Sequence, residues 1–138
     1  MREVGDAFHL AIPVADLAEA RRFYVTGLGC RLARTYPDRI TVDFFGDQLV
    51  CHLSDPEDLP GADGRPLALY PRHFGITFRA REDFDRLARL VELRKLEVFR
   101  PTALRFEGLV ESHRTFVLRD PSDNLIEFKH YDDPRMMY

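Results

Sequence analysis

The sequence predicts an α+β fold made of two similar βαβββ modules. Two observations support this prediction. Short β-prone runs and amphipathic helical stretches alternate in the same order in both halves of the 138 residues. In addition, a shift of 64 residues superimposes His9 on His73, Ile12 on Ile76 and Phe23 on Leu87 without a gap, as an internal repeat would. We expect the two modules to form a half-open, cup-shaped mixed β-sheet with the helices on the outside.

The first module covers about residues 5–54. It opens with a β-prone run at 8–14, after which Asp16 offers a side-chain oxygen to cap a helix. Apolar residues recur every three or four positions along that helix until the glycines at 27 and 29 end it. Three strands should follow, because turn residues separate three more β-prone runs; these runs are 30–35, 39–44 and 48–53.

The second module covers about residues 72–131 and repeats this order. Residues 55–71, rich in Pro, Gly and Asp, predict a linker before it, and residues 132–138 form a short C-terminal tail. Segment 101–113 has no counterpart in the first module, so we expect an insertion at the mouth of a site. The length favours a single domain over residues 1–138. In the second module we expect one strand that begins at residue 73 and three more at 97–100, 114–118 and 125–131. Its helix is expected to begin at Asp83.

Composition limits the class of protein and its partners. Hydrophobic residues make up 45% and charged residues 31%, a globular mixture with no apolar run that could cross a membrane. A net charge of −3 offers no basic surface for nucleic acid. Two cysteines and an N-terminus without an apolar stretch favour a cytoplasmic location. Open sheet edges favour a homodimer, and the expected partner is a small-molecule substrate.

Strand parity places the polar residues that carry chemistry. Alternate side chains of a strand face opposite sides of the sheet. In each of these strands the apolar side chains at every second position should face the helices, so His9, His73 and Glu127 should lie on the opposite side. In 48–53 the same argument leaves His52 on that side. A lone strand histidine is more often a hydrogen-bonded structural residue, but matched parity in a repeated module favours ligation. We predict a divalent metal (Fe(II), Ni, Co, Zn or Mn) held by His9, His73 and Glu127, with His52 as a candidate fourth ligand.

Other polar residues carry weaker signals. Arg105 and His113 lie in or beside the expected insertion, so we predict that they contact the substrate, although a solvated arginine is the plainer interpretation. His130 falls on the helix-facing parity and is predicted to be structural. Glu127, one of the predicted metal ligands, is also the predicted catalytic residue.

Five segments carry a resemblance to a known family; they are 8–14, 20–24, 28–30, 73–75 and 120–128. Together they resemble the vicinal oxygen chelate superfamily, which includes glyoxalase I, methylmalonyl-CoA epimerase, extradiol dioxygenases and fosfomycin- and bleomycin-resistance proteins. The resemblance implies metal ligation by His9, His73 and Glu127, and sometimes by the position of His52. Asp123 stands where the family usually has glycine. A bacterial subgroup named only glyoxalase, bleomycin-resistance or dioxygenase-like is similar more narrowly, at 48–53, 105–108 and 127–129.

The number of ligands separates the reactions that such a site could perform. Two histidines and one carboxylate leave three positions on an octahedral ion, which suits Fe(II) and dioxygenase-like chemistry. A fourth ligand leaves two positions, enough to chelate a substrate for isomerase or lyase chemistry of the glyoxalase or epimerase type. We expect a metal-dependent enzyme acting on a small oxygenated molecule. The alternatives are a metal-independent, bleomycin-resistance-like antibiotic-binding module and a fosfomycin-type thioltransferase.

Overall fold

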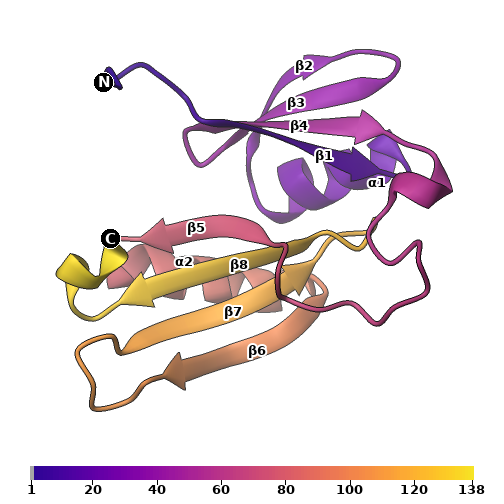
Figure 1. Cartoon of the computed structure of the whole chain (residues 1–138). Coiled ribbons are helices and arrows are strands. Elements are labelled where there is room, and N and C mark those ends of the chain that lie inside the picture. The colour runs from indigo at the N-terminus through magenta and orange to yellow at the C-terminus, as the bar shows by residue number, and fades with distance from the viewer. Residues whose placement is uncertain (1) are drawn as a thin grey trace. The chain divides into compact units, whose positions relative to one another are not determined.

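The computed structural model describes residues 2–138 and contains two compact units, each built around one four-stranded sheet (Figure 1). Unit 1 runs to Leu67 and includes Pro121–Asp123; unit 2 comprises Ala68–Asp120 and Asn124–Tyr138. Each unit holds one βαβββ module, so the predicted α+β fold class and the internal repeat are confirmed. The expectation of a single domain stays a prediction.

Unit 1 folds as a mixed sheet with one helical segment on it. The strand order is β1-β4-β3-β2; β1 and β4 are parallel and the other pairs are antiparallel. Buried apolar residues at every second position, such as Leu49 and Cys51, form the core under the helix. The elements are β1 (His9–Val14), α1 (Leu17–Arg21), the π-helix η1 (Arg22–Gly27), β2 (Arg31–Thr35), β3 (Arg39–Phe44), β4 (Asp47–Leu53) and the 3-10 helix η2 (Pro56–Asp58).

The helix of unit 1 differs in one respect from the regular helix that the apolar spacing predicts. Asp16 caps it as expected, accepting a hydrogen bond from the backbone N–H of Glu19. From Arg22 onward, however, the helix widens into a π-helix. Such π-helical turns occur mostly as short bulges inside α-helices. The wider turn lets the adjacent residues Phe23 and Tyr24 both enter the core, where their ring centroids are 4.9 Å apart.

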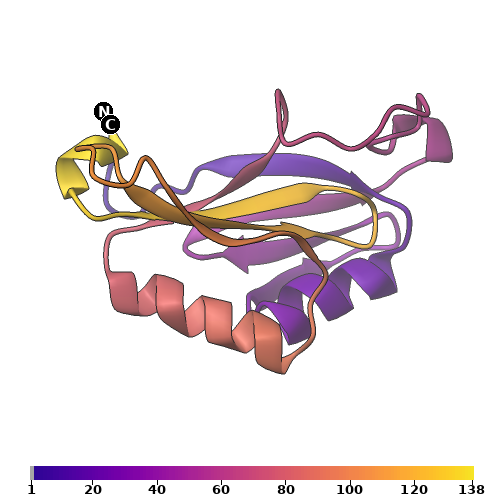
Figure 2. The same cartoon turned by 90° about the horizontal axis from the view of Figure 1, so that it is seen from below.

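Unit 2 repeats the arrangement with a longer helix. Its strand order is β5-β8-β7-β6, and β5 and β8 are parallel. Figure 2 shows α2 along one face of this sheet, where Phe84, Leu87 and Val91 are buried. The opposite face carries the candidate site. The elements are β5 (Phe74–Phe78), α2 (Arg81–Leu93), β6 (Val98–Arg105), β7 (His113–Arg119), β8 (Leu125–Tyr131) and the 3-10 helix η3 (Pro134–Met137).

Nearly half of the segment expected to be a long insertion, residues 101–113, is part of the sheet. Strand β6 continues to Arg105 and β7 begins at His113, so that only residues 106–112 connect them. Proline is usually excluded from strand interiors because it lacks a hydrogen-bond donor. Here Pro101 is accommodated because β6 is an edge strand whose pairing with β7 shifts register between Arg100 and Ala103.

Among residues 2–138, none of the helices has the length and hydropathy required to traverse a lipid bilayer.

Candidate metal centre

The faces predicted from strand parity agree with the burial of the strands. On β1, Ile12 and Val14 are buried, whereas His9 and Ala11 are exposed. On β4, Leu49 and Cys51 are buried and His52 is exposed. His9 and His52 therefore point to the side of the unit 1 sheet away from the buried row, as predicted.

In unit 2, two predicted ligands lie side by side. His73, just before β5, places Nε2 3.1 Å from Oε2 of Glu127 on β8. The carboxylate is nearly fully buried, with 8% of the side chain exposed, and the imidazole is 24% exposed. The other imidazole nitrogen, Nδ1, is 2.8 Å from the carbonyl oxygen of Leu69. Since a carbonyl only accepts, Nδ1 carries a hydrogen and donates it.

This orientation makes the His73–Glu127 contact chemically informative. With its hydrogen on Nδ1, a neutral imidazole turns the Nε2 lone pair toward the carboxylate, so two acceptor atoms face each other. Such a contact requires either a proton or a metal cation near both atoms. Ligand atoms at about 2.1 Å from one ion and at right angles lie about 3.0 Å apart, close to the observed 3.1 Å. Ligating histidines also commonly donate the other ring N–H to a backbone carbonyl. The pair therefore fits a divalent ion.

The Glu127 carboxylate is held from several sides. Thr115 on β7 donates a hydrogen bond from Oγ1 to Oε1 at 2.7 Å, and Nζ of Lys129 lies 3.7 Å from Oε2. Gly75 on β5 pairs with Glu127 across the sheet, and a Cβ at Gly75 would overlap the Glu127 carbonyl oxygen. These contacts set the position of β8 and the direction of its carboxylate.

The strand register also shows whether His52, the candidate fourth ligand, occupies the repeat position of Glu127; an equivalence of the two residues, expected because both lie on the closing strands of their modules, is wrong. Gly75 pairs with Glu127, so Glu127 lies two residues beyond the position opposite His73. On the parallel pair of unit 1, His9 pairs with Gln48, and the position two residues further is Val50. His52 lies another two residues on, opposite Pro13, about 13 Å along the strands from His9 at about 3.3 Å per residue. The strands β4 and β8 correspond, but these two residues do not.

The two predicted substrate contacts lie further along the same face as Glu127. His113 pairs with Tyr131, and Arg105 pairs with His113 across β6 and β7. Residues paired in this way share a face, so both side chains lie on the side of the sheet that carries Glu127. Tyr131 is four residues from Glu127 on β8, about 13 Å along the strand. Substrate contact by Arg105 and His113 stays a prediction.

The four predicted ligands are divided between the units, His9 and His52 in unit 1 and His73 and Glu127 in unit 2. Within either unit, the described residues contain no group of three or more His, Cys, Asp or Glu side chains that could hold a metal. Metal binding by the full set stays a prediction. His130, predicted to be structural, is buried with Nδ1 3.1 Å from the carbonyl oxygen of Phe78.

Sequence reasoning missed Thr115 as a partner of the carboxylate. A threonine in a β-prone run is ordinary, because β-branched residues favour strands. The only signal was its parity, which places it on the same face as Val117 and His113. Pairing with Lys129 brings it within reach of Glu127, and that pairing depends on the register of β7 against β8.

The paired βαβββ modules, each built around one four-stranded mixed sheet, define the class of α+β repeat proteins to which the chain belongs. The model of the Glyoxalase/Bleomycin resistance protein/Dioxygenase superfamily matches residues 7–128, and the chain belongs to this superfamily. No match was found among curated proteins.

Solved structures agree with this family assignment. A glyoxalase/bleomycin resistance protein/dioxygenase from Alicyclobacillus acidocaldarius is 59% identical, with a TM-score of 0.91 over 100% of both chains. Two more distant structures share the fold. Lactoylglutathione lyase from Agrobacterium tumefaciens is 19% identical, with a TM-score of 0.65 over 91% of this chain and 92% of that one. The fosfomycin resistance protein FosX from Listeria monocytogenes is 15% identical, with a TM-score of 0.68 over 93% and 94%.

Proposed function

We propose that this protein is a metal-dependent enzyme that acts on a small oxygenated molecule chelated to a divalent ion. The observation that carries the proposal is the contact between Nε2 of His73 and Oε2 of Glu127, 3.1 Å apart, with the imidazole oriented by the Leu69 carbonyl. His73 and Glu127 would hold the ion, with His9, the repeat equivalent of His73, as the third ligand.

The position of His52 favours one reaction type within this proposal. Because His52 lies four residues along the strands from the partner of His9, we leave it out of the ligand set. Two histidines and one carboxylate suit Fe(II), which when bound supplies open positions for a chelating substrate and for O2. We therefore propose dioxygenase-like chemistry in preference to isomerase or lyase chemistry.

The residues around Glu127 have separable roles in this proposal. Thr115 restrains Oε1 and leaves Oε2 turned toward His73. Val117, paired with Glu127 across the sheet, and Leu125 are buried beside it, so they limit the access of water and strengthen electrostatic interactions there. The ammonium group of Lys129 lies 3.7 Å from Oε2 of Glu127. There its positive charge would stabilise negative charge on a bound substrate.

Metal analysis of untagged protein tests the proposal. The native chain should bind one equivalent of Fe(II), and Co(II) should give a visible ligand-field spectrum as a substitute probe. His9→Ala, His73→Ala and Glu127→Ala should each lower the affinity for Co(II) by at least about tenfold. His52→Ala is the matched control, a histidine on the same sheet face as His9, and should bind Co(II) like the native chain.

Each contrary result has a definite meaning. Unchanged affinity for Co(II) in Glu127→Ala would end the metal proposal. Loss of the ion in His52→Ala would return the chemistry to the four-ligand, isomerase or lyase type. Stoichiometric binding of bleomycin that chelator leaves unchanged would identify an antibiotic-binding module, and a thiol-dependent product from fosfomycin would identify a thioltransferase.

We also propose that the protein is a cytoplasmic homodimer. Among the described residues 2–138, each sheet has two outer strands that lack a neighbour on one edge within that sheet, β1 and β2 in unit 1 and β5 and β6 in unit 2. Proteins normally cover such edges. Sedimentation at micromolar concentration should give the mass of two chains, and a monomer there would remove the dimer proposal.

A further inference from the structure

The face of unit 2 that carries Glu127 continues into a row of one ammonium group and several rings. Along β8, Glu127, Lys129 and Tyr131 alternate onto this face. Lys129 has only 29% of its side chain exposed, and Nζ lies 3.7 Å from Oε2 of Glu127 and 6.0 Å from the Tyr131 ring centroid. A lysine usually extends its flexible stem toward water, whereas this ammonium group lies between a carboxylate and a ring.

The rings form a continuous group at the end of this row. The His113 ring centroid is 4.7 Å from that of Tyr131 and 5.8 Å from that of Phe106. Phe106 is 57% exposed, although a large ring in a folded protein gains free energy by leaving water. The group therefore presents ring surface beside the ammonium group.

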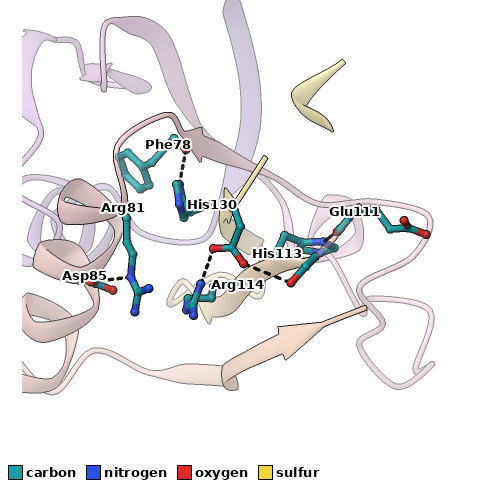
Figure 3. A network of polar contacts seen from close by, with 9 residues as sticks. Phe78, Arg81, Asp85, Glu111, His113, Arg114 and His130 are labelled. Carbon is teal, nitrogen blue, oxygen red and sulfur yellow. Dashed lines mark hydrogen bonds and ion pairs between the residues drawn. The ribbon is translucent and has the colours of Figure 1, made fainter. Parts of the chain in front are cut away.

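Polar contacts at the base of the connection between β6 and β7 hold the ring group in place (Figure 3). Arg114 donates to Asp132 at 2.7 Å, and Ser112 donates to the same carboxylate at 3.3 Å. His113 contacts the carbonyl oxygen of Glu111 through Nδ1 at 2.9 Å. These contacts join the start of β7 to the residue that follows β8, so His113 and its strand partner Tyr131 are held together before any ligand binds, which lowers the entropy cost of binding.

We propose that this face recognises a planar ring bearing a carboxylate, with Lys129 binding the carboxylate and Tyr131, His113 and Phe106 packing against the ring. This inference rests on the proposed function, since it concerns the substrate of that site. Arg105, exposed and paired with His113 on the same face, adds positive charge there. Once a cation engages Glu127, the part-buried ammonium group of Lys129 lacks its counter-charge. A carboxylate supplies it with charge-assisted hydrogen bonds. The 6.0 Å between Nζ and the Tyr131 ring suits a ring and carboxylate separated by one or two bonds.

Three probes of matched shape test charge and ring separately by calorimetry. They are phenylacetate, the uncharged phenylacetamide, and cyclohexylacetate, an anion without an aromatic ring. The native protein should bind phenylacetate about tenfold or more tighter than either analogue, because a charge-assisted contact and ring stacking each contribute about this much. Lys129→Met should remove the preference over the amide, Lys129→Arg should retain it, and Tyr131→Leu should remove the preference over cyclohexylacetate. Arg89→Met, on α2 and hence on the opposite side of the sheet, is the matched control and should bind like the native protein.

The experiment is run on chelator-treated protein and again on Co(II)-loaded protein, so that two failures remain distinguishable. A protein that binds Co(II) but prefers neither the charged nor the aromatic probe would overturn the inference and leave the metal proposal intact. A protein that ignores Co(II) but shows both preferences would end the metal proposal alone. If Lys129→Met keeps the preference for the charged probe, the assignment of Lys129 is overturned. If the variant loses that preference, a melting temperature close to that of the native protein excludes unfolding as the cause.

Discussion

Thr115 and Glu127, on neighbouring antiparallel strands, are joined by a 2.7 Å hydrogen bond from Oγ1 to Oε1. The bond occupies one carboxylate oxygen and leaves the other facing His73. Within unit 2 this makes Thr115 a positioning residue for the proposed ligand, a role that can be separated from simple packing because valine has nearly the same shape.

Thr115→Val should weaken Co(II) binding by about 10–100-fold, the usual effect of removing a hydrogen bond to a metal ligand. Thr115→Ser keeps the hydroxyl and should bind Co(II) within about threefold of the native protein. Equilibrium competition with a chromophoric chelator measures both variants. Equal Co(II) affinity in Thr115→Val and native protein would show that the hydroxyl only packs against Glu127.

Gly75→Ala should lower the free energy of unfolding by about 1–3 kcal/mol, the range found for overpacked sites. The added Cβ would overlap the backbone carbonyl of Glu127, so β5 and β8 must separate and the carboxylate must move. Chemical denaturation measures the loss. Gly5→Ala is the control, because a Cβ added there meets no atom within 4 Å in the described part of the chain beyond its two chain neighbours. Equal midpoints for the two variants would contradict the close approach of the strands.

Asp120→Ala should also lower the free energy of unfolding, by about 2–3 kcal/mol. Asp120 is buried at the start of the turn before β8, where its carboxylate accepts hydrogen bonds from the backbone N–H and the side-chain amide of Asn124, each at 2.9 Å. Thermal and denaturant melts measure the loss. Asp63→Ala, at an exposed turn that contacts Arg65, should change the midpoint little, and a similar loss in both variants would argue against a special role for the turn.

Cys30 should resist alkylation in the folded protein. Burial, with a smaller contribution from the Asp43 charge, raises the pKa of the Cys30 thiol from 9.0 to about 12, so the reactive thiolate is about a thousandfold scarcer at pH 8 than for an unperturbed thiol. A Cys51→Ala protein treated with iodoacetamide should stay unmodified when folded and react fully in denaturant, as mass spectrometry would show. Rapid reaction of the folded protein would contradict the burial.

The same shift predicts the direction of a pH effect. A thiol whose pKa is raised by folding contributes stability fully below pH 9, the unfolded value, and the contribution disappears as pH rises toward about 12. Stability should therefore fall over this interval more steeply in the native protein than in Cys30→Ala. Parallel curves for the two proteins would contradict the shift.

The sequence by itself determined the repeat, the order of the elements and the face on which each strand residue lies. Parity is a property of one strand, because side chains alternate along it, so the side of His9, Glu127 and His52 could be read directly. The shift of 64 residues between His9 and His73 was sufficient to place the two modules.

Only the tertiary structure decided which of these residues can act together, because register is a property of two strands and depends on how their side chains pack. It placed His52 two residues beyond the equivalent of Glu127, brought Thr115 onto the carboxylate, and set Lys129 between Glu127 and Tyr131. It also extended β6 through Pro101, because a free sheet edge tolerates a residue without a backbone donor.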